Sequence, residues 1–218
     1  MRIFLIHGMG RTPASMWVLD RRLRAAGYRP SLFGYFVTVS DLAAIAARFR
    51  RHVERVRAAD AARPDDRGYA IVSHSLGGII TRLVAPELPS GWRAFIMLAP
   101  PNRPPAVVTD VIGGLRLFRL FTQDAGEKLR DPAFYRDLPR PPVPTQVVAG
   151  TGGPRLAKLH LDAPNDGVLR AAETRLEGTE HVEVDAVHTF LMNRADVLAT
   201  IQGFFARHDF GPAPAEAR

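Results

Sequence analysis

The stretch Tyr69-Ala-Ile-Val-Ser-His-Ser75-Leu-Gly-Gly-Ile-Ile80 joins an apolar run to a helix-like pattern through a serine with small neighbours. The apolar run is typical of a buried strand, and the residues from Ile79 onward are typical of the first turns of a helix. The serine between them resembles the centre of a G-x-S-x-G turn, which holds a serine in a strained, exposed position at a helix N-terminus. There, backbone N–H groups and the helix dipole can stabilise a developing oxyanion. Ser75 is therefore a candidate nucleophile.

On either side of this stretch, strand-like runs alternate with helical patterns, which is typical of a mostly parallel sheet with helices on both faces. We expect an α/β fold with about six strands. The expected strands are 3–6, 31–36, the run into Ser75, 94–98, 145–149 and 181–185. The expected helices are 13–26, about 41–61 with Ser40 as its N-cap, the helix after Ser75 to near Pro86, and a last helix from its cap Asn193 to about Arg207.

Length and composition fit one domain of ordinary globular character. The chain has 218 residues, of which 46% are hydrophobic and 23% charged. This is enough for one large domain with a real core, whereas two domains would each be small. We expect residues 1–207 to form a single domain and residues 208–218 to be a flexible tail. Segment 101–144 breaks the alternation, with prolines at both ends and many apolar residues between them. It is either a plain crossover connection or an apolar flap over the site near Ser75.

The formal net charge is +7, and nearly all basic residues are arginines. A mild concentration occurs at Arg48, Arg50, Arg51, Arg55 and Arg57. Because the other face of this expected helix is apolar, a solvated face explains the arginines better than nucleic-acid binding does. We therefore predict no nucleic-acid partner.

The chain contains no cysteine, so disulfides, thiolate nucleophiles and cysteine-bound metals are excluded. We predict neither a cofactor nor a metal. The first six residues are too short for a signal peptide. No apolar run approaches the roughly 18 residues of a membrane span. We therefore expect a cytoplasmic protein without a membrane span.

A serine hydroxyl reacts only when a base removes its proton and a third group orients that base. In a parallel sheet such partners lie in loops at the carboxyl ends of later strands. His188 follows the strand expected at 181–185 and precedes the last helix, so it is the favoured base. His160 is the weaker alternative, whereas His181 begins a strand and His208 lies near the chain end. We expect His74 to point away from Ser75 across the strand and to be structural.

The third group should be an acid in the loop before that strand. Asn165-Asp166-Gly167 is a turn that follows the strand expected at 145–149. An aspartate in a tight turn beside glycine can aim its carboxylate at the next loop. Asp166 is the favoured acid, and Asp162 remains an alternative.

An oxyanion hole needs two N–H donors, one of them from Leu76, the residue after the nucleophile. The other should come from the loop after the first strand, His7-Gly8-Met9-Gly10. Its glycines allow close approach of the backbone, and the N–H of Met9 can point into the site.

The chain resembles the α/β-hydrolase superfamily, and within it the small bacterial lipase-like hydrolases. The resemblance spans nearly all of residues 1–207. It implies a minimal α/β-hydrolase fold and a serine esterase or lipase, with the catalytic roles on Ser75, Asp166 and His188. The stretches that carry it are His7–Gly10, His74–Gly78, Leu98–Asn102, Asp124–Leu129, Asn165–Val168 and His188–Met192.

The chain departs from this family where Ser73 stands in place of the usual first glycine of the turn. It also begins at the strand before the oxyanion loop, so we expect a fold without the usual leading antiparallel strands. The expected substrate is a small-molecule ester with an apolar acyl group. A thioesterase, amidase or acyltransferase would use the same residues, and a non-catalytic binding module with this fold is a further alternative. The oligomeric state is left open.

Overall fold

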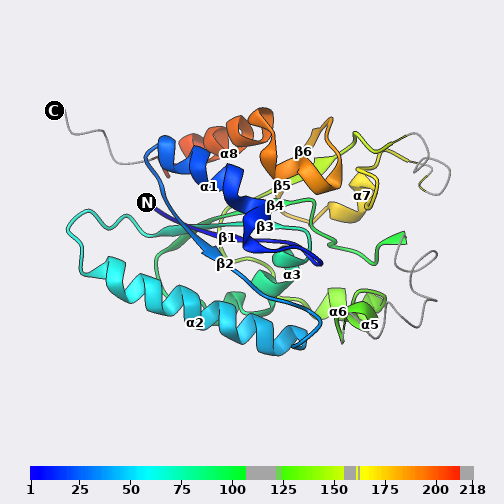
Figure 1. The fold of residues 1–218 in the computed structure, drawn as a ribbon, viewed down its shortest axis with the longest axis horizontal. Coiled ribbons are helices and arrows are strands. Elements are labelled where there is room, and N and C mark those ends of the chain that lie inside the picture. Colours follow the sequence, from blue (N-terminus) through cyan, green and yellow to red (C-terminus); the bar gives the residue numbers. More distant parts are fainter. Residues whose placement is uncertain (107–121, 123, 155–160, 162, 212–218) are drawn as a thin grey trace.

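The computed structural model describes residues 1–106, 122, 124–154, 161 and 163–211. The described residues contain one six-stranded sheet in the order β2-β1-β3-β4-β5-β6, and Figure 1 shows this sheet between layers of helices. The predicted α/β class and strand number are confirmed. All five strand pairings are parallel, so the sheet is fully rather than mostly parallel. The strands are β1 (Arg2–Ile6), β2 (Arg29–Phe33), β3 (Tyr69–His74), β4 (Trp92–Leu98), β5 (Thr145–Gly150) and β6 (Glu180–Val184).

Helices cover both faces of the sheet. In the view of Figure 1, α1 (Trp17–Ala25) and α8 (Ala195–Arg207) lie on the upper face, and α2 (Leu42–Ala61) and α3 (Leu76–Leu83) lie on the lower face. Shorter helices follow in the later connections. They are α5 (Ala125–Lys128), α6 (Pro132–Asp137) and α7 (Ala171–Thr174). None of the helices in the described part of the chain is both long and apolar enough to cross a membrane.

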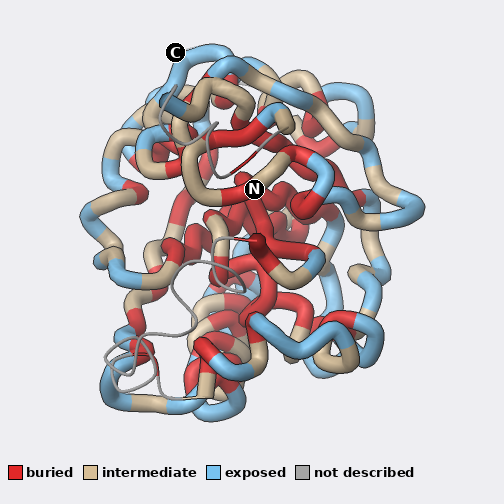
Figure 2. Tube along the Cα trace, turned by 90° about the vertical axis from the view of Figure 1, so that its right-hand side faces the viewer, coloured by how far each residue is buried: buried red, intermediate tan, exposed pale blue. Residues whose placement is uncertain are grey.

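The core is divided by the sheet into two apolar clusters. Alternate residues of a strand point to opposite faces. In β1, Phe4 and Ile6 belong to the cluster under α2 and α3, whereas Ile3 and Leu5 belong to the cluster under α1 and α8. Burying each such side chain stabilises the fold by about 1.5–3 kcal/mol. Figure 2 shows the buried segments gathered in the interior and the exposed ones outside. The continuous apolar runs of the central strands follow from burial on both faces.

Several element ends differ from the predictions because local capping decides them. The N-cap of α2 is Asp41 rather than Ser40, and its carboxylate accepts the N–H of Ala44 at 2.7 Å. The predicted first helix is a 3₁₀ turn (Pro13–Met16) followed by α1. The predicted cap Asn193 ends another 3₁₀ turn (His188–Asn193), and α8 begins only at Ala195.

Two predicted segments fall partly outside the described residues. Residues 107–121 of the crossover or flap are among them, so its apolar stretch lies outside the described part of the chain. Residues 212–218 of the expected tail (208–218) also lie outside the described residues, whereas the chain is still packed at the start of that segment. Phe210 is buried, and Arg93 lies over its ring at 5.0 Å.

The turn between β3 and α3 depends on a glycine. A Cβ atom on Gly77 would lie 2.8 Å from the carbonyl oxygens of both Ile6 and His7, a distance at which the backbone must shift. Gly77 therefore lets α3 begin directly against the end of β1.

We expect Gly77→Ala to lower the free energy of unfolding by about 1–3 kcal/mol, because the added methyl group has no space. Gly203→Ala is the matched control within another helix, since the nearest atom to its Cβ is the flexible end of Arg207 at 3.5 Å. The control should stabilise the protein by up to about 1 kcal/mol through helix propensity. Urea denaturation measures both. Equal stability of the two variants would contradict this account of the turn.

Candidate active site

Ser75 occupies a strained position between β3 and α3. Its φ is 50° and its ψ is −122°, a combination that residues with a side chain rarely adopt. Its N–H donates to the carbonyl of Leu98 in β4 at 2.8 Å. Because Leu76 is the first residue of α3, its N–H has no acceptor within the helix. The hydroxyl of Ser75 and an N–H that the helix itself does not use therefore belong to the same helix N-terminus.

The loop after β1 packs directly against this serine. A Cβ atom on Gly8 would lie 2.9 Å from both the Cβ of Ser75 and the Nδ1 of His74. Gly10 has a φ of 66°, which favours glycine. The predicted oxyanion loop is thus in contact with the predicted nucleophile, and only a glycine at position 8 allows this approach.

His7 and Tyr35 hold that loop in one conformation. Their rings stack with centroids 4.4 Å apart, and the Tyr35 hydroxyl donates to the His7 carbonyl at 2.9 Å. The Tyr35 N–H donates to the His7 Nε2 at 3.3 Å, so the proton of neutral His7 is on Nδ1. That Nδ1–H donates to the Gly8 carbonyl at 2.9 Å. Burial lowers the pKa of His7, which favours this neutral form.

These contacts fix the direction of one N–H group. All peptide bonds among the described residues are trans, so the C=O and N–H of each bond point in opposite directions. The Gly8 carbonyl points toward the His7 ring, and therefore the Met9 N–H points away from it. Sequence reasoning placed Met9 in this loop but did not find the residues that orient it.

Asp166 sits in a turn after β5 that satisfies both of its carboxylate oxygens. Oδ1 accepts the N–H groups of Val168 at 2.9 Å and Leu169 at 2.7 Å, and Oδ2 faces His188. Gly167, with a φ of 95°, allows the chain to turn. Asn165 braces the turn by accepting the N–H of Gly167 and donating to the carbonyl of Ala163. The carboxylate is therefore held in a single orientation.

His188, which follows β6, makes two hydrogen bonds to Asp166. Its Nδ1 lies 2.7 Å from Oδ2 of Asp166, and its own N–H donates to the Asp166 carbonyl at 2.9 Å. An ionised carboxylate only accepts hydrogen bonds, so the proton of a neutral His188 is on Nδ1. Nε2 is then left as a base. The side chain is 11% exposed, which leaves it accessible at one edge.

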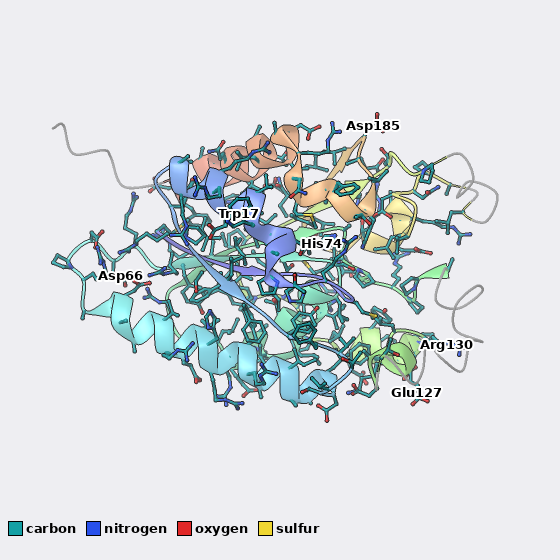
Figure 3. All side chains as sticks on the ribbon, in the orientation of Figure 1. Trp17, Asp66, His74, Glu127, Arg130 and Asp185 are labelled. Carbon is teal, nitrogen blue, oxygen red and sulfur yellow. The ribbon has the colours of Figure 1, made fainter. Side chains whose placement is uncertain are left out.

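His74 adds a third contact to His188 that sequence reasoning missed. We expected His74 to point away across the strand, but its Nε2–H donates to the His188 carbonyl at 3.0 Å, and the two rings are 4.8 Å apart. Figure 3 shows His74 inside the molecule, whereas Asp66 and Asp185 lie near the periphery. The sequence feature that could have indicated this contact is the position of His74 directly before Ser75. Through this contact, the residue before Ser75 is tied to His188.

The alternatives for the base and the acid, His160 and Asp162, lie outside the described residues. The described residues include no group of three or more His, Asp or Glu side chains placed to bind a metal ion. Of the predicted site residues, Ser75, Asp166, His188, Met9 and Leu76 all lie within the described part of the chain, and hydrogen bonds join Asp166 to His188.

A parallel sheet with a strained serine after β3, and an Asp–His pair after β5 and β6, defines an α/β-hydrolase architecture. A sequence model of the alpha/beta hydrolase family matches residues 3–211. The chain belongs to that family. A comparison with curated proteins gives no match.

Solved structures with this fold include several lipases and esterases. The mature form of the Bacillus licheniformis lipase BlEst2 is 16% identical with a TM-score of 0.67, and the match covers 94% of this chain and 90% of the lipase. The metagenomic carboxyl esterase MGS0156 is 17% identical with a TM-score of 0.67, over 96% of this chain and 76% of the esterase. The product of gene lin2722 from Listeria innocua is 14% identical with a TM-score of 0.61, over 94% and 93%. At these identities the likeness shows the shared fold.

We expect Tyr35→Phe to lower the free energy of unfolding by about 1–3 kcal/mol, because the buried His7 carbonyl loses its hydrogen bond. Tyr28→Phe is the matched control, since Tyr28 is also buried but no hydrogen bond of its hydroxyl occurs among the described residues. The control should change the stability by less than about 0.5 kcal/mol. Urea denaturation compares the two, and equal losses would contradict the role of the Tyr35 hydroxyl.

The buried His74 should make the protein less stable in acid. Burial, and then the nearby charge of His188, hold the pKa of His74 well below its ordinary value. Below about pH 6.5 the unfolded chain therefore binds a proton that the folded chain does not, and stability falls by up to about 1.4 kcal/mol per pH unit.

His74→Gln keeps an amide donor for the His188 carbonyl but does not titrate. We expect its free energy of unfolding to fall less steeply with acid than that of the wild type between about pH 6.5 and 5, and to show no such difference in slope above pH 7. Urea denaturation at a series of pH values measures this. Parallel curves below pH 6.5 would show that His74 is protonated in the folded protein as readily as in the unfolded chain.

Proposed function

We propose that this protein is a serine hydrolase that cleaves carboxylic esters through an acyl-enzyme on Ser75. The observation that carries the proposal is the 2.7 Å hydrogen bond between Asp166 and His188, on the loop that His74 ties to the strained serine. Asp166 holds the imidazole in the tautomer whose Nε2 can accept a proton. The lipase and esterase structures with the same fold are consistent with this chemistry.

In the proposed first step, the Ser75 oxygen attacks the acyl carbon while the Nε2 of His188 takes the hydroxyl proton. The negative charge that develops on the carbonyl oxygen is stabilised by the N–H groups of Met9 and Leu76. The imidazolium formed on His188 is stabilised by the carboxylate of Asp166. The C–O bond to the alcohol then breaks, and His188 gives its proton to the leaving oxygen.

The second step releases the acid. Water takes the place of the alcohol, His188 removes a proton from it, and the resulting hydroxide attacks the acyl carbon. The bond to Ser75 breaks, and His188 returns the proton to the serine oxygen. The same two N–H groups stabilise the negative charge on the carbonyl oxygen in each step.

The proposed substrate is a small ester with an apolar acyl group, as the apolar segment 101–144 suggests. Thioesters, amides and transfer of the acyl group to an acceptor other than water would use the same residues. These alternatives differ from ester hydrolysis in the leaving group or in the acceptor of the acyl group.

We expect the wild type to hydrolyse p-nitrophenyl esters with a rate that depends on acyl chain length. Ser75→Ala should lower kcat by about 10⁶-fold and Asp166→Asn by about 10⁴-fold, with little change in KM, because both groups act in the transition state. Spectrophotometric release of p-nitrophenol measures these rates.

Ser73→Ala is the matched control, because Ser73 is a buried serine two residues away whose hydroxyl makes a single hydrogen bond among the described residues, to the Ile96 carbonyl at 3.4 Å. It should keep the wild-type rate to within a few-fold. A fluorophosphonate should label Ser75 in the wild type and in Ser73→Ala. An inactive, unlabelled wild type would favour the non-catalytic binding module, and equal activity of wild type and Ser75→Ala would reject Ser75 as the nucleophile.

A further inference from the structure

A pocket lies between the edge strand β2 and helix α2, and neither Ser75, Asp166 nor His188 lines it. It is a surface pocket of about 580 Å³. One wall is the chain from Leu32 to Gly34 at the end of β2, and the other wall is a face of α2 that carries Arg48, Arg51, His52 and Arg55. The 3- and 4-residue spacing of the arginines puts them on one side of the helix. Arginine supplies every ionisable group of the lining except one histidine.

The three arginines of this pocket differ from Arg50 and Arg57 of the same helix in their partners. Among the residues that the structure describes, none of Arg48, Arg51 and Arg55 forms an ion pair, and no Asp or Glu lines the pocket. Their neighbours on other sides of the same helix differ. Arg50 pairs with Glu54 at 3.1 Å, and Arg57 pairs with Asp66 at 2.7 Å. The arginine-rich stretch thus contains paired cations outside the pocket and unpaired cations along it.

The hydrogen bonds of His52 indicate that the pocket lining offers hydrogen-bond donors to a ligand. Arginine cannot accept a hydrogen bond, so the contact of 3.2 Å between Arg55 Nη2 and His52 Nδ1 makes Nδ1 the acceptor. The Nε2–H of His52 then donates to the Ser31 hydroxyl at 3.0 Å. Burial, and then the charges of Arg55 and Arg2, lower the pKa of His52, consistent with a neutral ring. Both nitrogens are used, which leaves the guanidinium groups to meet a ligand.

The charge of this lining is complementary to an anion with several acceptor oxygens. Three like charges on one helix face repel each other, and a bound anion would relieve this repulsion. Guanidinium groups bind phosphate oxygens through paired hydrogen bonds that are shorter and stronger than those between neutral groups. The volume is many times that of a water molecule, at about 30 Å³ each, so it has room for an organic group beside the phosphate.

We propose that Arg48, Arg51 and Arg55 form a binding site for a phosphate ester, with the phosphate on the guanidinium groups and its organic part along the end of β2. The shared chemistry is a phosphate bearing a small polyol, which occurs both in soluble phosphomonoesters and in the headgroups of anionic phospholipids. The site involves none of the residues of the ester-hydrolysis proposal, so it stands or falls separately from that proposal.

The test uses a triple variant, Arg48→Gln, Arg51→Gln and Arg55→Gln, which keeps the side-chain bulk and removes three charges. The control is a second triple variant, Arg21→Gln, Arg194→Gln and Arg207→Gln, which loses the same charge from exposed positions on and beside α1 and α8. Glycerol 3-phosphate is titrated into each protein by calorimetry in low-salt buffer, with glycerol as the ligand without phosphate. Co-sedimentation with phosphatidylcholine vesicles, with and without phosphatidylglycerol, forms the second arm.

We expect saturable binding by the wild type and the control variant, at least about tenfold weaker in the pocket variant, and weakened by added salt. Binding of glycerol 3-phosphate would assign the site to soluble phosphomonoesters. Binding only of vesicles with phosphatidylglycerol, lost in the pocket variant but not in the control, would assign it to the lipid headgroup. No binding in either arm, or equal binding by the pocket and control variants, would overturn the proposal.

Discussion

The site depends on one sharp turn, in which the chain passes from β3 to α3 through a serine with positive φ. This turn is possible only where neighbouring backbones come very close. Gly8 lies against the serine and Gly77 lies against the end of β1, and a Cβ atom at either position would be within 2.9 Å of other atoms. The strain at Ser75 persists because packing on both sides of the sheet over-determines it. The parallel sheet and the strained conformation of Ser75 thus result from the same packing.

Hydrogen bonds to main-chain groups do most of the positioning around this turn. His188 is held through its N–H, its carbonyl and its ring, by Asp166 on one side and His74 on the other. The loop after β1 is held in a similar way by His7 and Tyr35. Both supporting histidines are buried, with pKa values lowered by burial. A neutral histidine offers one donor and one acceptor, and His7 uses both to set the direction of a neighbouring peptide.

The sequence was sufficient for the parts of this structure that follow from pattern. Continuous apolar runs gave the parallel strands, and the glycines around Ser75 and Asp166 gave the turns. The sequence could not predict the contacts between residues that are far apart in the chain. Tyr35 lies 28 residues from His7, and His74 lies 114 residues from the carbonyl that it binds, and neither pair has a local signature. Helix ends were also missed, because Ser40 and Asp41 are both good caps and only the three-dimensional path of the chain decides between them.

The arginines of α2 are a second case in which the sequence pattern could not predict the contacts between elements. Composition and helical periodicity place Arg48, Arg51 and Arg55 on a solvated face, and each is indeed exposed. Whether such a face is merely solvated depends on the positions of the carboxylates that could pair with its arginines. These positions are set by the elements that pack beside the helix. Asp66 and Glu54 neutralise the arginines beside them, whereas β2 brings no carboxylate to the pocket that it forms with α2. A helix face that keeps unpaired cations beside a pocket has a physical reason to bind an anion, which the same arginines on an open surface would lack.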